Sequence, residues 1–394
     1  ISNSFAQPKL IVGIVADQMR YDYLAKYEGQ FGEGGFQRFL SEGYSFNDHH
    51  FNYLPTFTGP GHASIFTGSV PGLHGIIGNN WYNFETGENH YCVEDANVKP
   101  IGTDNADCKR SPANLLTTTF GDQLLFHNSM QGKVIGVSIK DRAAILPAGH
   151  RANAAYWMDG KSGDFVSSSY YMDALPDWLQ SFNQRKLADK YLDQNWTLLK
   201  DESFYPEKDA SPAEGKFKGL DSNTFPYNLK KLKKENGVGI VGNTPWGNTI
   251  TADLAIAAIE GESLGQDEIT DLLTVSFSSP DKIGHQFGPH SREVHDMYLR
   301  FDQDLAQLFE YLDKEIGMEN VLIFFTADHG AADVPAFVKG NTDYYSNEDL
   351  KKQLNELYKS TFEVDELIEG FSNFQLYLDR DKMEEKEVSV EDVV

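Results

Sequence analysis

The sequence has little cysteine, few cations for its many acids, and no long apolar run. Of 394 residues only 2 are cysteine, and 34 Lys and Arg stand against 59 Asp and Glu, a formal net charge of −25. Binding a nucleic acid requires clustered Lys and Arg, so this balance argues against duplex DNA or RNA as a partner. The longest apolar run, Leu10 to Ala16, is too short to span a bilayer. We therefore expect a soluble protein with neither membrane nor nucleic acid duplex as a partner.

The acidic balance is still compatible with a small anionic substrate. Charges are screened over roughly 8–10 Å at moderate ionic strength, so a local cationic site can act independently of distant surface acids. Apolar residues make up 40% of the chain and charged residues 24%, which is typical of a globular protein and excludes a disordered one. The length allows several domains, or one large α/β domain with insertions.

The cysteines and the amino terminus bear on the compartment. Cys92 and Cys108 lie in a stretch rich in Gly, Asn and Asp. They form either a disulfide, which indicates an oxidising compartment, or two reduced thiols. Residues 1–10 contain neither the charged nor the apolar region of a signal peptide, so either none existed or the sequence begins at a mature N-terminus.

Short apolar runs alternate with amphipathic stretches along the chain. Runs typical of buried strands in a mainly parallel sheet occupy Leu10–Val15, Val134–Ile139, Leu272–Phe277 and Val321–Thr326. Apolar residues at three- and four-residue spacing predict helices at Gly35–Leu40, Leu115–Asn128, Thr251–Glu262 and Val294–Lys314. This alternation predicts an α/β sandwich with a central, mainly parallel sheet and helices on both faces.

Two stretches interrupt the alternation. Residues from about 157 to about 238 are rich in Tyr, Trp, Pro, Lys and Asp and carry no strong strand signal. From about 336 the sequence turns polar and acidic and reaches Val394 without a closing strand. We expect residues 1–394 to form one catalytic domain with an insertion at about 157–238, outside the central sheet, and a second insertion that begins at about 336.

Carboxylates and imidazoles follow three of the predicted strands. The residues at these strand ends are Asp17, Asp281, His285, Asp328 and His329. In α/β sheets, ligands bind beyond the carboxyl ends of the strands, and Asp and His are the residue types that bind catalytic Zn²⁺. A lone Asp at a strand end is more often a helix cap or a turn residue. Their joint placement at equivalent strand ends predicts a metal site.

A second cluster lies at residues 53–68, which read YLPTFTGPGHASIFTG. Gly59 and Pro60 are suited to the first turn of a short helix, so Thr58 would lie at its N-terminus, where free N–H groups favour negative charge. A hydroxyl in contact with a metal there can ionise and attack phosphorus. Thr58 is therefore either a nucleophile or only an N-cap.

Six segments in chain order resemble the alkaline phosphatase superfamily. They are Ala16–Gln18, Thr58–His62, Gly78–Tyr82, Ser138–Arg142, Ser279–His285 and Thr326–Gly330. The resemblance is to the branch with a threonine nucleophile, which nucleotide pyrophosphatase/phosphodiesterases share with phosphate-irrepressible alkaline phosphatases. It implies an α/β sandwich with inserted subdomains and a two-zinc site. We further expect a periplasmic or secreted protein whose signal peptide has been removed.

The resemblance also implies a covalent phosphothreonine and two Zn²⁺ ions. Thr58 would be the nucleophile that takes the phosphoryl group. The implied ligands are, for the first zinc, Asp17, Thr58, Asp328 and His329 and, for the second, Asp281 and His285. The second zinc would stabilise the leaving oxygen and later hold the attacking water. Two metals roughly 3.5–4 Å apart can hold both ends of an in-line displacement.

Asn79, Lys140 and Arg142 bear on the substrate class. By resemblance Asn79 donates its amide to a phosphoryl oxygen, although alone it would be read as a turn residue. Lys140 and Arg142 follow a strand two residues apart, so both can lean toward one face and stabilise the charge of a phosphate monoester. Alternatively, both are solvated surface cations.

This Lys-x-Arg pair resembles the phosphate-irrepressible alkaline phosphatases, and diesterases of the branch lack it. We therefore expect the hydrolysis of small phosphate monoesters. The alternatives are a phosphodiesterase or nucleotide pyrophosphatase, and a non-catalytic binder of metal or phosphate.

The sequence departs from the family at the second zinc. The family takes a further histidine ligand from a Gly-x-His segment near the C-terminus, but no histidine follows His329 in this sequence. Three explanations remain: a chain truncated before that segment, a second metal with an incomplete shell and weak activity, or an inactive relative. We prefer the first, because the sequence stops within a region outside the expected core.

Overall fold

The computed structural model describes residues 7–84, 86–210, 214–335, 346–373 and 375–393. A seven-stranded sheet lies at its centre. Its strands are β1 (Leu10–Ala16), β4 (Pro100–Ile101), β5 (Val134–Ser138), β6 (Ala154–Met158), β7 (Phe165–Ser168), β10 (Asp271–Phe277) and β11 (Val321–Thr326). They lie in the order β11-β1-β10-β5-β6-β7-β4. The strands from β11 to β6 are parallel, whereas β7 and β4 pair antiparallel at the far edge.

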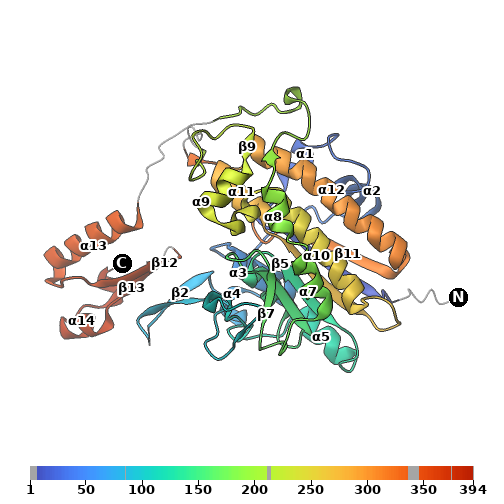
Figure 1. The fold of residues 1–394 in the computed structure, drawn as a ribbon. Helices are drawn as coiled ribbons and strands as arrows, with labels where there is room; N and C mark the ends of the chain where they lie inside the picture. The colour runs from blue at the N-terminus through green and yellow to red at the C-terminus, as the bar shows by residue number, and fades with distance from the viewer. Residues whose placement is uncertain (1–6, 85, 211–213, 336–345, 374, 394) are drawn as a thin grey trace.

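Helices cover both faces of this sheet (Figure 1). One face packs against α10 (Trp246–Glu262), α11 (Ser279–Phe287) and α12 (Arg292–Glu315). The other packs against α3 (Thr58–Thr67), α5 (Phe120–His127) and α6 (Asp141–Ala148). In β1, Val12 and Ile14 belong to the first core and Ile11 to the second, since successive side chains point to opposite faces. A strand buried on both faces must be apolar throughout, which explains the uninterrupted run in the sequence.

The predicted α/β sandwich is confirmed, with two local differences. α5 begins at Phe120, later than the predicted Leu115, because Thr119 and Asp122 form a capping box in which each side chain accepts a hydrogen bond from the other's backbone N–H. β11 was expected to be buried, but it lies at an edge of the sheet and Leu322 is 53% exposed.

β6 and β7 were not predicted from the sequence. β7 falls within the stretch expected to lie outside the sheet, but it pairs with β6 through Trp157–Val166 and Met158–Phe165. A short antiparallel strand near a sheet edge leaves a weak signal in the sequence. After β7, this stretch forms α7 (Asp177–Gln184), α8 (Leu187–Leu192), β8 (Asn195–Trp196), η2 (Glu202–Phe204), β9 (Tyr227–Asn228) and α9 (Leu229–Asn236).

The remaining elements before residue 336 are short. They are α1 (Asp22–Lys26), α2 (Phe36–Glu42), α4 (Pro71–His74), β2 (Asn80–Asn83), β3 (Glu88–Tyr91), η1 (Ala106–Cys108), η3 (Val238–Asn243) and η4 (Met318–Asn320). Within the described ranges, no helix is both long and apolar enough to cross a membrane.

Residues 346–373 and 375–393 form a small unit beside the β2–β3 ribbon (Figure 1). Its elements are α13 (Asn347–Phe362), β12 (Ile368–Ser372), β13 (Gln375–Leu378), α14 (Arg380–Glu385) and α15 (Val390–Val393). The Tyr82 hydroxyl donates to Oε2 of Glu369 at 3.0 Å, and Nδ2 of Asn373 donates to the carbonyl of Asn80 at 2.7 Å. The unit thus contacts the ribbon that follows Asn79. The expected start of a second insertion, at about 336, lies outside the described residues.

Cys92 and Cys108 are free, buried thiols rather than a disulfide. Burial raises the pKa of Cys92 to about 12 and that of Cys108 to about 11. Because the thiolate is the reactive form, both are unreactive at neutral pH. Of the two alternatives for Cys92 and Cys108, the structure therefore agrees with two reduced thiols.

Candidate active site at the carboxyl edge of the sheet

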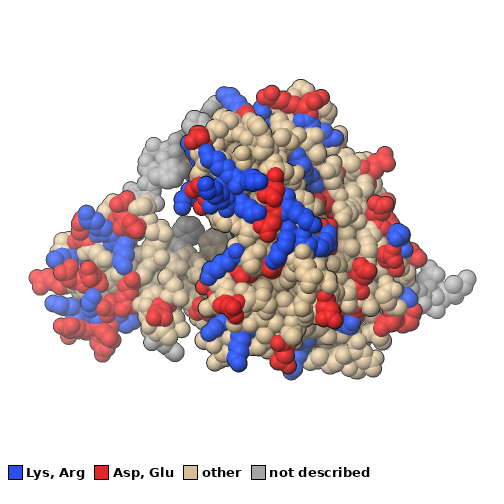
Figure 2. Space-filling view, viewed as in Figure 1, with Lys and Arg blue, Asp and Glu red and all other residues tan. Residues whose placement is uncertain are grey.

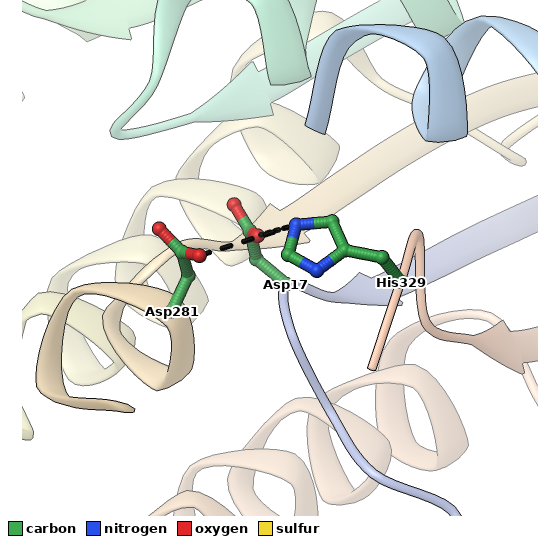
Figure 3. A group of neighbouring side chains, drawn as sticks. All are labelled: Asp17, Asp281 and His329. Carbon is green, nitrogen blue, oxygen red and sulfur yellow. Dashed lines mark ion pairs between the residues drawn. The ribbon is translucent and has the colours of Figure 1, made fainter. Parts of the chain in front are cut away.

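Three parallel strands bring acidic and imidazole side chains together (Figure 3). Asp17 follows β1, Asp281 lies in the first turn of α11 after β10, and His329 lies in the loop after β11. One ligand atom of each lies within 4.8 Å of the others. Nε2 of His329 is 3.4 Å from Oδ1 of Asp17 and 4.0 Å from Oδ1 of Asp281. The cause is the sheet order, since β1 pairs in parallel with both β10 and β11.

Asp328 and His285 lie beside this group. Asp328 is fully buried, and its Oδ1 accepts hydrogen bonds from the backbone N–H of Gln18 (3.1 Å) and of His329 (2.9 Å). Its Oδ2 lies 3.8 Å from Nε2 of His329. His285 places Nε2 3.1 Å from Oδ1 of Asp281, one helical turn earlier, although its side chain is 73% exposed. The five predicted Asp and His ligands thus form one group.

The arrangement fits a divalent metal ion. Oδ1 of Asp17 and Oδ2 of Asp328 are buried without a well-formed hydrogen bond from the described residues, and each has an imidazole nitrogen nearby, of His329 at 3.4 Å and of His62 at 3.2 Å. A buried carboxylate oxygen is costly unless a cation or a metal compensates it. Carboxylate oxygens and imidazole nitrogens are donor types of catalytic zinc sites.

The neighbouring charges keep the carboxylates ionised. Burial raises the pKa of Asp328, but the charges of His329 and His62 lower it to about 2. Burial and Asp328 raise the pKa of Asp17, yet Lys140 and His329 bring it below its ordinary value. Burial lowers the pKa of His329, and the carboxylates of Asp328 and Asp17 outweigh this and raise it to about 10. Ionised carboxylates are the form that binds metal.

Lys140 lies between two of these carboxylates. It follows β5 as the N-cap residue of α6, and its side chain is almost completely buried. Its Nζ is 2.6 Å from Oδ2 of Asp17 and 2.6 Å from Oδ2 of Asp281. The same nitrogen is 3.5 Å from Oγ1 of Thr58. Lys140 is therefore a buried cation of the site rather than a solvated surface residue.

Thr58 is the first residue of α3 and is buried. Phe57, not Thr58, occupies the N-cap position, and no side chain caps the helix. The interpretation of Thr58 as an N-cap is therefore wrong. Instead its Oγ1 is 3.5 Å from Nη2 of Arg142, as it is from Nζ of Lys140. The hydroxyl thus faces two cations.

Arg142 and Asn79 both lie close to Thr58. Arg142 donates from Nη1 to the Tyr91 hydroxyl at 3.1 Å, and its Nε is buried without a hydrogen-bond acceptor among the described residues. Oδ1 of Asn79 accepts a hydrogen bond from the N–H of Gly59 at 2.7 Å. That bond fixes the Asn79 amide next to Thr58, and its Nδ2 donates to no residue in the part of the chain that the structure describes.

His62 is a site residue whose role the sequence analysis missed. Its Nδ1 is 2.9 Å from the carbonyl oxygen of Thr58 and 3.2 Å from Oδ2 of Asp328, and its Nε2 is 2.8 Å from Oγ of Ser276. It lies one helical turn after Thr58 in the same matching segment. That spacing is the signal by which it could have been found.

Gln18 was missed as well. Its backbone is in the left-handed region, with φ of 64°, and Nε2 donates to Oδ1 of Asp281 at 2.9 Å. Together with its N–H bond to Asp328, this links the loops that follow three strands. Its place directly after Asp17 was the available signal.

A pocket of about 350 Å³ opens beside Lys140 and Arg142. The carboxyl ends of β5 and β6, the loop at η1, and residues of η3 and α11 line it. Lys282 of α11 lies in this wall. Burial lowers the pKa of Lys282, and the nearby charges of Lys140 and Arg142 lower it further. Three cations are thus close together.

The chain is similar to phosphohydrolases along its whole length. A family model described as type I phosphodiesterase / nucleotide pyrophosphatase matches residues 11–391. A protein of Myroides odoratus named calcium-transporting ATPase is 46% identical over 100% of this chain and 73% of its own length. Alkaline phosphatase PafA of Elizabethkingia meningoseptica is 44% identical, with the same coverage. Alkaline phosphatase PhoV of Synechococcus elongatus is 49% identical over 85% of this chain and 61% of its own length.

Solved structures of PafA have the same fold. The crystal structure of the wild-type protein is similar to this chain with a TM-score of 0.95 at 44% identity, over 99% of this chain and 76% of that one. A PafA variant in which a threonine, an asparagine, a lysine and an arginine are replaced has a TM-score of 0.94 at 42% identity, with the same coverage.

Proposed function

The chain belongs to the type I phosphodiesterase/nucleotide pyrophosphatase family and is an enzyme of the alkaline phosphatase type, and we propose that it hydrolyses small phosphate monoesters through a covalent phosphothreonine. The observation that carries the proposal is the environment of the Thr58 hydroxyl, which lies 3.5 Å from both Lys140 and Arg142. Lys140 in turn contacts Asp17 and Asp281, two carboxylates of the proposed metal site.

Two zinc ions are part of this proposal. The residues that would hold them are Asp17, Thr58, Asp328 and His329 for one and Asp281 and His285 for the other. When bound, zinc supplies a Lewis acid that lowers the pKa of a hydroxyl and neutralises charge on the phosphoryl oxygens.

The side chains of the chain account for the remaining steps. Lys140 and Arg142 bind the non-bridging oxygens of the phosphoryl group, and Asn79 donates its amide to one of them. The Thr58 oxygen attacks phosphorus, the ester P–O bond breaks, and the alcohol leaves with a proton. Water then attacks the phosphothreonine and releases inorganic phosphate. His62 holds the backbone of Thr58 during both steps.

The cations favour monoesters over diesters. A monoester dianion has more charge on its non-bridging oxygens than a diester, so two cations beside the nucleophile stabilise it more strongly. In the replaced residues of the PafA variant, the order threonine, asparagine, lysine, arginine is that of Thr58, Asn79, Lys140 and Arg142. In both chains one residue separates the lysine from the arginine. This parallel supports the assignment.

A phosphodiesterase is the second candidate, because the description of the matching family model favours it. The periplasmic or secreted location remains a prediction from the sequence.

The test is zinc-dependent hydrolysis of p-nitrophenyl phosphate at alkaline pH by the parent and by Thr58→Ala. We expect turnover by the parent and a loss of at least about 10³-fold in Thr58→Ala. Thr67→Ala is the matched control, since its hydroxyl donates to the carbonyl of Ala63 and accepts from the N–H of Ser69, neither of which belongs to the proposed site. ATP belongs in the substrate panel because of the Myroides relative. Bound zinc with no phosphate release from any substrate would favour the non-catalytic alternative.

A further inference from the structure

We propose that the pocket beside Lys140 and Arg142 is a second anion site, which holds a phosphate on the alcohol side of the substrate. The preferred substrates would then be phosphate monoesters whose alcohol carries another phosphate. This inference rests on the proposed function, because it names the substrate class of the same site.

The pocket is cationic in a strongly acidic chain. Five basic side chains line it, from Arg110, Lys140, Arg142, Lys161 and Lys282, against two acids, Asp107 and Asp141. The lining has a formal charge of 5 − 2 = +3, whereas the chain has −25. Its volume of about 350 Å³ is in the range of small-molecule sites. Such a lining suits a ligand with more negative charge than one phosphoryl group.

Most of these cations already have protein partners. Nε of Arg110 is 2.8 Å from Oδ2 of Asp141. Nζ of Lys161 is 2.7 Å from Oδ1 of Asn105 and 3.5 Å from Oδ2 of Asp107. These pairs hold side chains of the pocket wall in place. Both acids of the lining, Asp141 and Asp107, are thus already paired with cations.

Lys282 is the exception. Its ammonium has neither a hydrogen bond nor an ion pair with any of the described residues, although the side chain is half-buried. It lines the same pocket as Lys140 and Arg142. A bound anion stabilises a half-buried cation whose ammonium has no protein anion beside it. Lys140 and Arg142 bind the phosphoryl group that reacts, so Lys282 is available to bind a second phosphate.

The pocket lining also contains apolar side chains. Trp157, Met158 and Ile139 line the same pocket. They offer a surface for the carbon skeleton that joins two phosphates. The pocket thus offers a bisphosphate both cations for its phosphates and apolar groups for its carbon skeleton.

A basic surface adjoins the pocket. Figure 2 shows Lys and Arg side chains gathered over α8 and α9, and α9 alone contributes Lys230, Lys231, Lys233 and Lys234. η3 contacts both helices, and Gly239 of η3 lies in the pocket wall. A positive surface next to a pocket raises the local concentration of anionic ligands. It therefore favours entry of a highly charged substrate.

The test compares propane-1,3-diol bisphosphate with 3-hydroxypropyl phosphate, which differ by one phosphate. The readout is the ratio of their kcat/KM values in each zinc-loaded variant. We expect a ratio well above the factor of two that two equivalent phosphates give, and a fall of about tenfold in that ratio for Lys282→Gln. Lys352→Gln removes an exposed lysine of α13, outside both the pocket and the basic surface, and its ratio should equal that of the parent. Lys161→Gln is the second variant, for use if Lys282→Gln does not fold.

Each outcome bears on one proposal. A parent ratio of two or less would overturn the second anion site and leave the phosphatase intact. A parental ratio in both Lys282→Gln and Lys161→Gln would also overturn it. If the parent hydrolyses neither compound, the proposed function fails instead. Calorimetric binding then decides the pocket, since tighter binding of the bisphosphate to the parent than to Lys282→Gln supports it and equal binding overturns it.

Discussion

Nδ1 of His62 lies 3.2 Å from Oδ2 of Asp328, and neither side chain is exposed to solvent. His62 belongs to α3, one turn after Thr58, whereas Asp328 follows β11. The contact therefore joins the helix of the proposed nucleophile to the loop of the proposed metal ligands. Because the same nitrogen also lies 2.9 Å from the Thr58 carbonyl oxygen, His62 fixes the nucleophile relative to the metal site.

We predict that His62→Ala lowers kcat by about 10–100-fold with a much smaller change in KM, because it displaces the nucleophile and a ligand without removing a substrate contact. Steady-state kinetics on p-nitrophenyl phosphate measure the split. His127→Ala is the control, since His127 is exposed at the end of α5. Parental kcat in His62→Ala would refute the positioning role.

A substitution at Gly61 tests the packing of α3 against the loop after β11. A Cβ at this position would lie 2.4 Å from the carbonyl oxygen of Asp328 and 2.8 Å from its Cβ. Gly61→Ala must therefore push α3 away from the loop after β11, and we expect a loss of about 1–3 kcal/mol in stability together with most of the activity. Gly72→Ala is the matched control, because nothing lies within 4 Å of its added Cβ. Thermal unfolding and turnover measure both, and a parental Gly61→Ala would contradict the close packing.

The sequence predicted the proposed metal ligands better than the contacts that hold the site together. Asp17, Asp281 and His329 follow apolar runs, and parallel strands bring such residues to one edge by their geometry alone. The contact of His62 with Asp328 depends on how α3 packs against the sheet, which no local pattern records. The same is true of Lys140, whose sequence suggested a phosphate contact but not its place between Asp17 and Asp281.

The strands of the central sheet also differ in how well the sequence predicted them. β1, β5 and β10 are buried on both faces, so their apolar runs were sufficient to predict them. β7 is a short antiparallel strand, Phe165–Ser168, whose two serines give no apolar run. Its place depends on pairing with β6 rather than on its own residues.

Lys140 separates the two candidate functions. We predict that Lys140→Ala lowers kcat/KM for a monoester by about 10²–10³-fold and lowers it much less for a diester, because the lost charge stabilises chiefly the more highly charged transition state. p-Nitrophenyl phosphate and bis-p-nitrophenyl phosphate provide the comparison. Equal losses on both substrates would remove the argument for a monoesterase.

Glu293 provides a prediction for stability away from the site. Burial raises the pKa of Glu293 to about 8 from an ordinary value of 4.5, although the hydrogen bond from Tyr227 lowers it, and its Oε2 has no partner among the described residues. A folded-state pKa above the unfolded value means that the parent loses stability as the pH rises from about 4.5 to about 8.

Glu293→Gln cannot ionise, so its stability relative to the parent should improve by about 3–5 kcal/mol between pH 5 and pH 9. Denaturant unfolding at the two pH values measures this change. Glu356→Gln is the control, because Glu356 is exposed on α13. The same stability difference between parent and Glu293→Gln at both pH values would show that Glu293 does not titrate as inferred.

The most direct test of the phosphothreonine is to trap it. The zinc-loaded parent is mixed with a phosphate monoester, quenched in acid during turnover, and analysed by intact and peptide mass spectrometry. The account predicts the mass of one added phosphoryl group, located on Thr58 and missing from Thr58→Ala. Steady turnover with no phosphorylated protein, or with the phosphoryl group on another residue, would contradict it.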